Sequence, residues 1–86
     1  MNILIVDDSK VSRLTILKRM PQEIKATASI FQGANGEEAV ALFKEHSPDI
    51  VFLDLTMPIM DGFEALIHII AHDAQATVFD TCVRTW

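Results

Sequence analysis

An apolar run that ends on an aspartate constrains the fold of this chain more than any other feature. Residues 50–53 are four consecutive apolar side chains, and Asp54 and a turn-rich segment at 55–62 follow at once. A short apolar run bounded by turn signals is typical of a strand buried on both faces, as parallel sheets require. Asp54 is therefore predicted to lie at the carboxyl end of a central strand, where ligands bind in open α/β sheets.

The beginning of the chain repeats this pattern. Residues 3–6 are apolar and lead directly into Asp7 and Asp8. If the two strands are parallel neighbours about 4.8 Å apart, three carboxylates converge at one end of the sheet. Two such charges about 5 Å apart repel by roughly 3 kcal/mol at an effective dielectric near 20, and protonation or a bound cation relieves that repulsion. Oxygen ligands with room for waters and a phosphate favour Mg²⁺. The alternative is two unrelated strand-end acids that cap turns.

The rest of the chain predicts strands alternating with helices. The first helix is expected to begin near Ser9 and to end near Met20, because proline at position 21 either ends it or begins a separate turn. A weak alternating pattern predicts a strand over 26–31, and a last strand is expected over 76–81. This order of elements predicts a parallel sheet. One face of the first helix is marked by Val11, Leu14 and Leu17.

Two further helices are predicted from their starts and apolar spacing. Asn35 and Glu38 have the spacing of a capping box, which favours a helix beginning there. One face of that helix is marked by Ala39, Leu42, Phe43 and His46. Asp61 is the expected cap of the last helix. Five apolar side chains of the last helix are predicted to face the core because they follow the helical repeat: Phe63, Leu66, Ile67, Ile70 and Ala71.

Length and composition bound the class of protein. The 86 residues make one domain, and a hydrophobic content of 50% predicts a packed core rather than disorder. A net charge of −5 argues against a nucleic-acid-binding surface. The lone Cys82 allows no internal disulfide, which fits a reducing, cytoplasmic compartment. No signal peptide or membrane span is expected, because acids interrupt the apolar start and other apolar runs are short.

The motifs together resemble the receiver domain of two-component response regulators. The resemblance is carried by Val6-Asp7-Asp8-Ser9, by Asp54-Leu55-Thr56-Met57-Pro58 and by Asp61-Gly62, and it covers residues 1 to about 80. It implies a flavodoxin-like, doubly wound parallel sheet, here shortened to about four strands in the order 2-1-3-4 with three helices.

The resemblance also implies a role for each site residue. Asp54 would accept a phosphoryl group from a histidine kinase or phosphotransfer protein, and the chain would act on a downstream protein partner. Asp8, Asp54 and the Thr56 backbone carbonyl match the family's Mg²⁺ ligands, and Asp7 would act through water or by orienting the site. Thr81 aligns with a hydroxyl residue that contacts the phosphate. A turnover enzyme is not expected.

The chain departs from the family pattern at its end. The family's last strand and helix have no counterpart, and no lysine follows Lys44, whereas the family pairs a later lysine with the phosphate. An exposed edge on the fourth strand would favour a homodimer, by edge pairing or segment exchange. The alternative function is therefore a dimeric interaction module that works without phosphorylation. A phosphatase of the haloacid dehalogenase type is a third candidate, but that family requires an aspartate where Thr56 stands.

Overall fold

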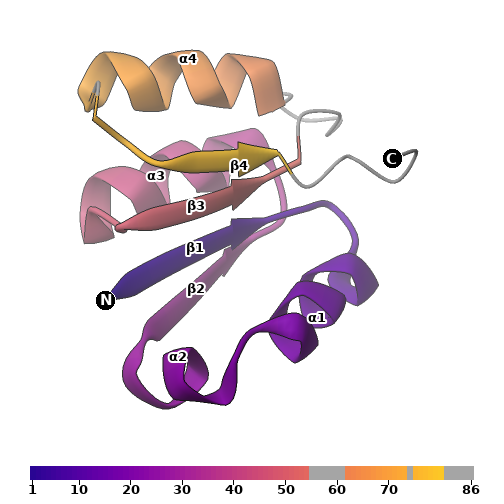
Figure 1. Ribbon diagram of the computed structural model, residues 1–86. Helices are drawn as coiled ribbons and strands as arrows, with labels where there is room; N and C mark the ends of the chain where they lie inside the picture. Colours follow the sequence, from indigo (N-terminus) through magenta and orange to yellow (C-terminus); the bar gives the residue numbers. More distant parts are fainter. Residues whose placement is uncertain (55–61, 74, 81–86) are drawn as a thin grey trace.

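The fold is a parallel sheet enclosed between two layers of helices (Figure 1). The computed structural model describes residues 1–54, 62–73 and 75–80. Its strands are β1 (Asn2–Val6), β2 (Ser29–Gly33), β3 (Ile50–Leu53) and β4 (Val78–Asp80). They form one sheet in the order β2-β1-β3-β4, and each neighbouring pair is parallel. The predicted fold class and strand order are confirmed.

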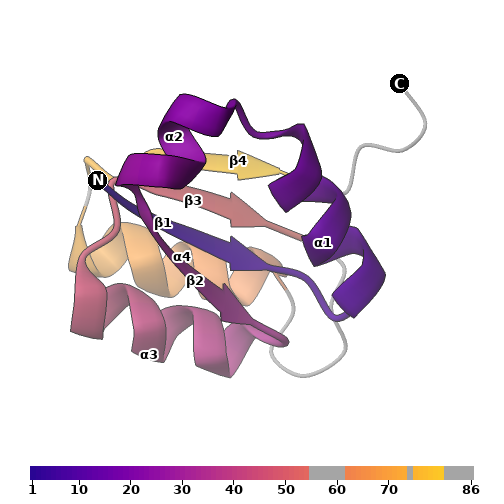
Figure 2. The ribbon, with the colours of Figure 1, turned by 90° about the horizontal axis from the view of Figure 1, so that it is seen from below.

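Four helices cover the two faces of this sheet within the described residues. The helices α1 (Lys10–Arg19) and α2 (Gln22–Thr27) lie on one face, and α3 (Gly36–His46) and α4 (Gly62–His72) lie on the other (Figure 2). The prediction of three helices was wrong. Pro21 is the reason, because it ends α1 and then stands at the cap position of a second, short helix.

Because of this short helix, the second strand begins later than predicted. Ala26 and Thr27 were predicted to begin a strand, but both belong to α2, and β2 starts only at Ser29. The Thr27 hydroxyl donates to the Glu23 carbonyl at 2.9 Å, one turn earlier in the same helix. The displaced strand then pairs with β1 from Asn2–Ser29 to Val6–Gly33.

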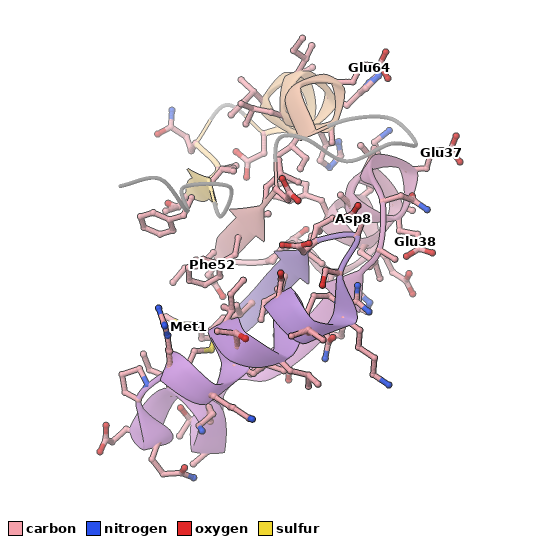
Figure 3. All side chains as sticks on the ribbon, turned by 90° about the vertical axis from the view of Figure 1, so that its right-hand side faces the viewer. Met1, Asp8, Glu37, Glu38, Phe52 and Glu64 are labelled. Carbon is pink, nitrogen blue, oxygen red and sulfur yellow. The ribbon has the colours of Figure 1, made fainter. Side chains whose placement is uncertain are left out.

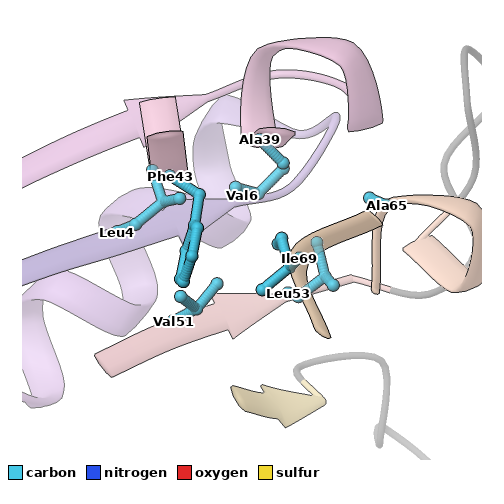
Figure 4. Close-up of a cluster of buried hydrophobic side chains, with 8 residues drawn as sticks. All are labelled: Leu4, Val6, Ala39, Phe43, Val51, Leu53, Ala65 and Ile69. Atoms are coloured by element: carbon cyan, nitrogen blue, oxygen red, sulfur yellow. The ribbon is translucent and has the colours of Figure 1, made fainter. Parts of the chain in front are cut away.

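The main core lies between the sheet and the α3–α4 layer (Figure 4). Alternate side chains of β1 and β3 point into it, as the period of a strand requires. Phe43 of α3 fills the centre, with 2% of its surface exposed. The buried cluster consists of Leu4, Val6, Ala39, Phe43, Val51, Leu53, Ala65 and Ile69.

The α4 helix packs through a different face from the one that its spacing predicted. Ala65 and Ile69 are buried, whereas Ile67 is 68% exposed and Ile70 is 40% exposed. Leu66 is half-buried, Ala71 is exposed, and the side chain of Phe63 lies outside the described set. Since residues 65–71 are all apolar except His68, several faces fit the helical repeat and the pattern could not select one. Despite this apolarity, no helix in residues 1–54, 62–73 and 75–80 has the length needed to cross a membrane.

The start of α3 follows its sequence signature closely. The Asn35 side chain accepts a hydrogen bond from the Glu38 amide at 2.9 Å, so the predicted cap is confirmed. The Ala34 amide in turn donates to the Glu38 carboxylate at 2.7 Å, whereas a standard capping box uses the amide one residue later. The cap of α4 predicted at Asp61 lies outside the described residues.

The face under α1 and α2 carries an apolar pocket of about 470 Å³. Ile16 of α1 lines this pocket, whereas Val11 and Leu14, predicted to mark one face of that helix, are 73% and 43% exposed. The other lining residues come from both helices, from the link between them and from the sheet: Ile3, Arg19, Met20, Pro21, Ile24, Ile50 and Phe52.

Candidate metal site

Parallel pairing of β1 and β3 places two acid-bearing positions side by side. Val6 lies opposite Leu53, and the next residue on each strand is an aspartate. The Asp54 amide donates to the Val6 carbonyl at 3.0 Å, and the Asp7 amide donates to the Gly33 carbonyl at 3.2 Å. Because these bonds extend the ladders beyond the strands, the sheet fixes the backbone of both aspartates.

The three predicted carboxylates meet at this edge. One oxygen each from Asp7, Asp8 and Asp54 lies within 4.8 Å of the other two. Asp7 is 5% exposed and Asp54 is 2% exposed, whereas Asp8 is exposed at the mouth of the site, where Figure 3 labels it. The predicted convergence of these three side chains is therefore confirmed.

The electrostatics of this cluster oppose a full negative charge. Burial raises the pKa of the Asp7 carboxyl above its ordinary value, and the nearby charges of Asp54 and Asp8 raise it further. The Ser9 amide, which donates to Asp7 Oδ1 at 2.9 Å, acts in the opposite direction and lowers that pKa. Because desolvation and repulsion prevail, the cluster favours the uptake of either a proton or a cation.

The loop that carries Asp7 and Asp8 is short and well bonded. Ser9 caps α1, and its side chain accepts a hydrogen bond from the Ser12 amide at 3.3 Å. Four residues after Ser9, Arg13 donates from Nη1 to the Asp7 carbonyl at 2.5 Å and from Nε to Gln32 Oε1 at 3.0 Å. Arg13 was not among the predicted site residues. A basic residue one turn after the capping serine was the available signal.

The donor set fits Mg²⁺. The three acids offer hard, anionic oxygen ligands on one side of a site whose mouth is exposed at Asp8, and Mg²⁺ prefers such partial coordination with waters completing its shell. Asp7, Asp8 and Asp54 are the described residues that would hold the ion. Thr56 and Thr81, the other two predicted site residues, lie outside the described residues.

More acidic side chains surround this end of the sheet (Figure 3). Glu37 and Glu38 lie in the first turn of α3, and Glu64 lies in the first turn of α4. A field of one sign attracts counter-ions and repels like charges. This end of the sheet therefore favours cations over anions.

The sequence pattern of the response regulator receiver domain family matches residues 3–81. The chain is 47% identical over 79 residues to the chemotaxis protein CheY of Bacillus subtilis, a match covering 88% of this chain and 62% of that protein. It is 38% identical over 76 residues to CheY of Halobacterium salinarum, covering 88% and 61% of the two chains.

Solved structures give the same likeness. The REC domain of AraT, a response regulator from Geobacillus stearothermophilus, superposes with a TM-score of 0.80 at 28% identity, covering 90% of this chain and 60% of that one. A chain of the CheX–CheY–BeF3–Mg²⁺ complex from Borrelia burgdorferi superposes with a TM-score of 0.71 at 41% identity, covering 91% and 58%. This chain thus spans less than two thirds of the length of each of these relatives.

Proposed function

The chain belongs to the response regulator receiver domain family, and from that premise we propose that it is a phosphoacceptor of a two-component phosphorelay. Asp54 receives the phosphoryl group, and the donor is a histidine kinase or a histidine phosphotransfer protein. The observation that carries this proposal is the meeting of three carboxylates within 4.8 Å at the carboxyl edge of the sheet. Mg²⁺ as the cofactor is part of the proposal, and it is supported by the Borrelia complex, which contains Mg²⁺ together with CheY.

In the proposed reaction an oxygen of the Asp54 carboxylate attacks the phosphorus of a phosphohistidine. The new P–O bond forms as the P–N bond breaks, the imidazole leaves with the bonding electron pair, and the product is an acyl phosphate. Transfer of this kind depends on in-line positioning and on neutralisation of the phosphoryl oxygens more than on a strong base. When bound, Mg²⁺ supplies that neutralisation.

The chain's own residues fix the acceptor and the cation ligands. Asp54 is held by the β1–β3 ladder and is 2% exposed, so its carboxylate has a limited choice of positions. Asp7 and Asp8 would hold the cation beside it. By the family resemblance, the Thr56 carbonyl would be a further ligand and the Thr81 hydroxyl would contact the phosphate.

The partners and the setting complete the proposal. The Borrelia complex joins a CheY to CheX, and by analogy this chain would act on a downstream protein partner. It is a stoichiometric acceptor and not a turnover enzyme. The single Cys82, which allows no internal disulfide, supports a cytoplasmic location.

Phosphorylation by acetyl phosphate tests the proposed function. With Mg²⁺, the intact mass of the chain should rise by one phosphoryl group, and chelation of Mg²⁺ or the substitution Asp54→Asn should abolish the gain. Asp49→Asn is a matched control, because Asp49 is an exposed carboxylate just before β3, at the opposite end of that strand. An Asp54→Asn chain that gains the mass, or a wild-type chain that never does, would contradict the proposal.

A second candidate is the dimeric interaction module, for which the described residues offer one exposed ring on β4. Within the described residues β4 pairs with β3 alone, and Phe79 of β4 is 50% exposed while stacking on Phe52 at 5.6 Å. A second copy that paired along β4 would cover this ring. Light scattering at micromolar concentration tests the idea: the wild type should be a dimer, and Phe79→Ser should shift it toward the monomer. A wild-type chain that is monomeric would refute the idea.

A further inference from the structure

Arg13 joins three segments around the acidic site. Its backbone amide donates to the Ser9 carbonyl at 3.1 Å, as the first turn of α1 requires. Its guanidinium donates to the Asp7 carbonyl at 2.5 Å and to the Gln32 side chain at 3.0 Å. One residue thus connects the end of β1, the start of α1 and the outer strand β2.

The Asp7 carbonyl has little access to water and needs a hydrogen-bond donor from the protein. Asp7 is 5% exposed, and its amide already continues the ladder to Gly33 of β2. A mostly buried carbonyl at the end of a ladder is costly to leave without a hydrogen-bond partner. The planar guanidinium provides this partner and a second donor toward Gln32 at the same time.

The geometry keeps this cation away from the carboxylate oxygens. Within the described residues, Arg13 forms no ion pair with Asp7 or Asp8. The Asp7 Oδ1 atom instead accepts the Ser9 amide at 2.9 Å. Arg13 therefore fixes the backbone that carries the acids without competing for their metal-binding atoms.

We infer that Arg13 is a positioning residue for the acidic site: by holding the Asp7 carbonyl it sets the turn at residues 7–9, so that Asp7 and Asp8 share a divalent cation with Asp54. Its effect on phosphoryl transfer rests on the proposed function, whereas its effect on the turn and on cation binding does not. Partners that orient metal ligands without touching the metal typically contribute about 10–100-fold to affinity.

The test compares Arg13→Gln and Arg13→Lys with Lys18→Gln, which removes the same charge from an exposed position on the same helix. Three quantities are measured: the Mg²⁺ dissociation constant by calorimetry, the Ser9 amide exchange rate by NMR, and acetyl phosphate labelling as a function of Mg²⁺. Arg13→Gln should weaken Mg²⁺ binding about tenfold and speed Ser9 exchange, with β3 amides unchanged. Labelling should need more Mg²⁺ but reach a similar maximal rate. Arg13→Lys should fall between wild type and Arg13→Gln.

Gln32 provides an internal check, because it is the second acceptor of the same guanidinium. Gln32→Leu should weaken Mg²⁺ binding in the same direction but less, and the double variant should be no weaker than Arg13→Gln alone. Equal Mg²⁺ affinity and equal Ser9 exchange in Arg13→Gln and Lys18→Gln would overturn the inference. If the wild type binds Mg²⁺ but is never labelled, the proposed function fails while the first two measurements still decide the role of Arg13.

Discussion

The ring of Phe31 on β2 stacks on the ring of His46 in the last turn of α3, with centroids 3.8 Å apart and planes inclined by 13°. This contact joins α3 to the outer strand of the sheet. We expect Phe31→Leu and His46→Ala each to destabilise the protein. In a double-mutant cycle measured by urea unfolding, the two changes should couple by about 0.5–1.5 kcal/mol. Strictly additive effects would show that the stack contributes only through the area that each ring buries.

The corrected face of α4 can be tested with one conservative substitution at two positions. Ile69 is 1% exposed and Ile67 is 68% exposed, so removing the same methyl group should have unequal effects. Ile69→Val should cost about 0.5–1.5 kcal/mol of unfolding free energy, and Ile67→Val less than about 0.5 kcal/mol. Chemical denaturation of both variants measures the difference. A larger loss at Ile67 would restore the face predicted from the spacing.

The pH dependence of stability should report on Asp7. Its raised pKa means that the folded protein binds this proton more tightly than the unfolded chain does. The stabilisation from the neutral carboxyl is therefore complete below the unfolded pKa of about 3.9. It is lost as the pH rises through the folded pKa. Asp7→Asn cannot ionise, so its stability relative to wild type should increase over this window and then level off.

Urea unfolding of both proteins from about pH 4 upward, without divalent cations, measures this difference. A difference that stayed flat across the window, or that fell with rising pH, would contradict the assignment. Adding Mg²⁺ at neutral pH supplies the control, because a ligand that binds only the folded state stabilises it. Mg²⁺ should raise the stability of the wild type more than that of Asp7→Asn.

The cap of α3 gives a prediction that does not depend on the acidic site. Asn35→Ala removes the acceptor of the Glu38 amide and should cost about 1 kcal/mol. Asn35→Ser retains an oxygen that can cap the helix, so most of that stability should remain. Thermal and urea unfolding would measure both changes. Equal losses in the two variants would mean that the Asn35 side chain does more than cap the helix.

The meeting of Asp7 and Asp54 was predictable because strand pairing alone brings their backbones to one edge of the sheet. Asp7 and Asp54 each follow an apolar strand directly, and parallel neighbours end at the same edge of a sheet, so no knowledge of side-chain packing was needed. Arg13 was not predictable in this way. Its role depends on how far a long side chain reaches from α1 to the end of β1 and to Gln32, which only the packing of α1 on the sheet determines.

The helices show when sequence periodicity can predict the buried face and when it cannot. In α3 the pattern marks a single face. Ala39 and Phe43 were expected on that face, and both are buried. In α4 nearly every position from 65 to 71 is apolar, so burial was decided by the approach of α3 and β3 and not by the pattern. The shift of β2 has a similar origin, because Ala26 and Thr27 tolerate both strand and helix and the turn at Pro21 decides between them.

The burial of β1 has a consequence for how this molecule can respond to a ligand. Ile3, Leu4, Ile5 and Val6 are each no more than 2% exposed, and the strand is bonded on both sides. A close-packed interior of this kind has low compressibility, so a local force displaces its backbone only slightly. If Asp54 is phosphorylated as proposed, the new charge lies beside a strand that has little room to shift. A change of shape is then expected at the surface around the carboxyl edge of the sheet and not in β1.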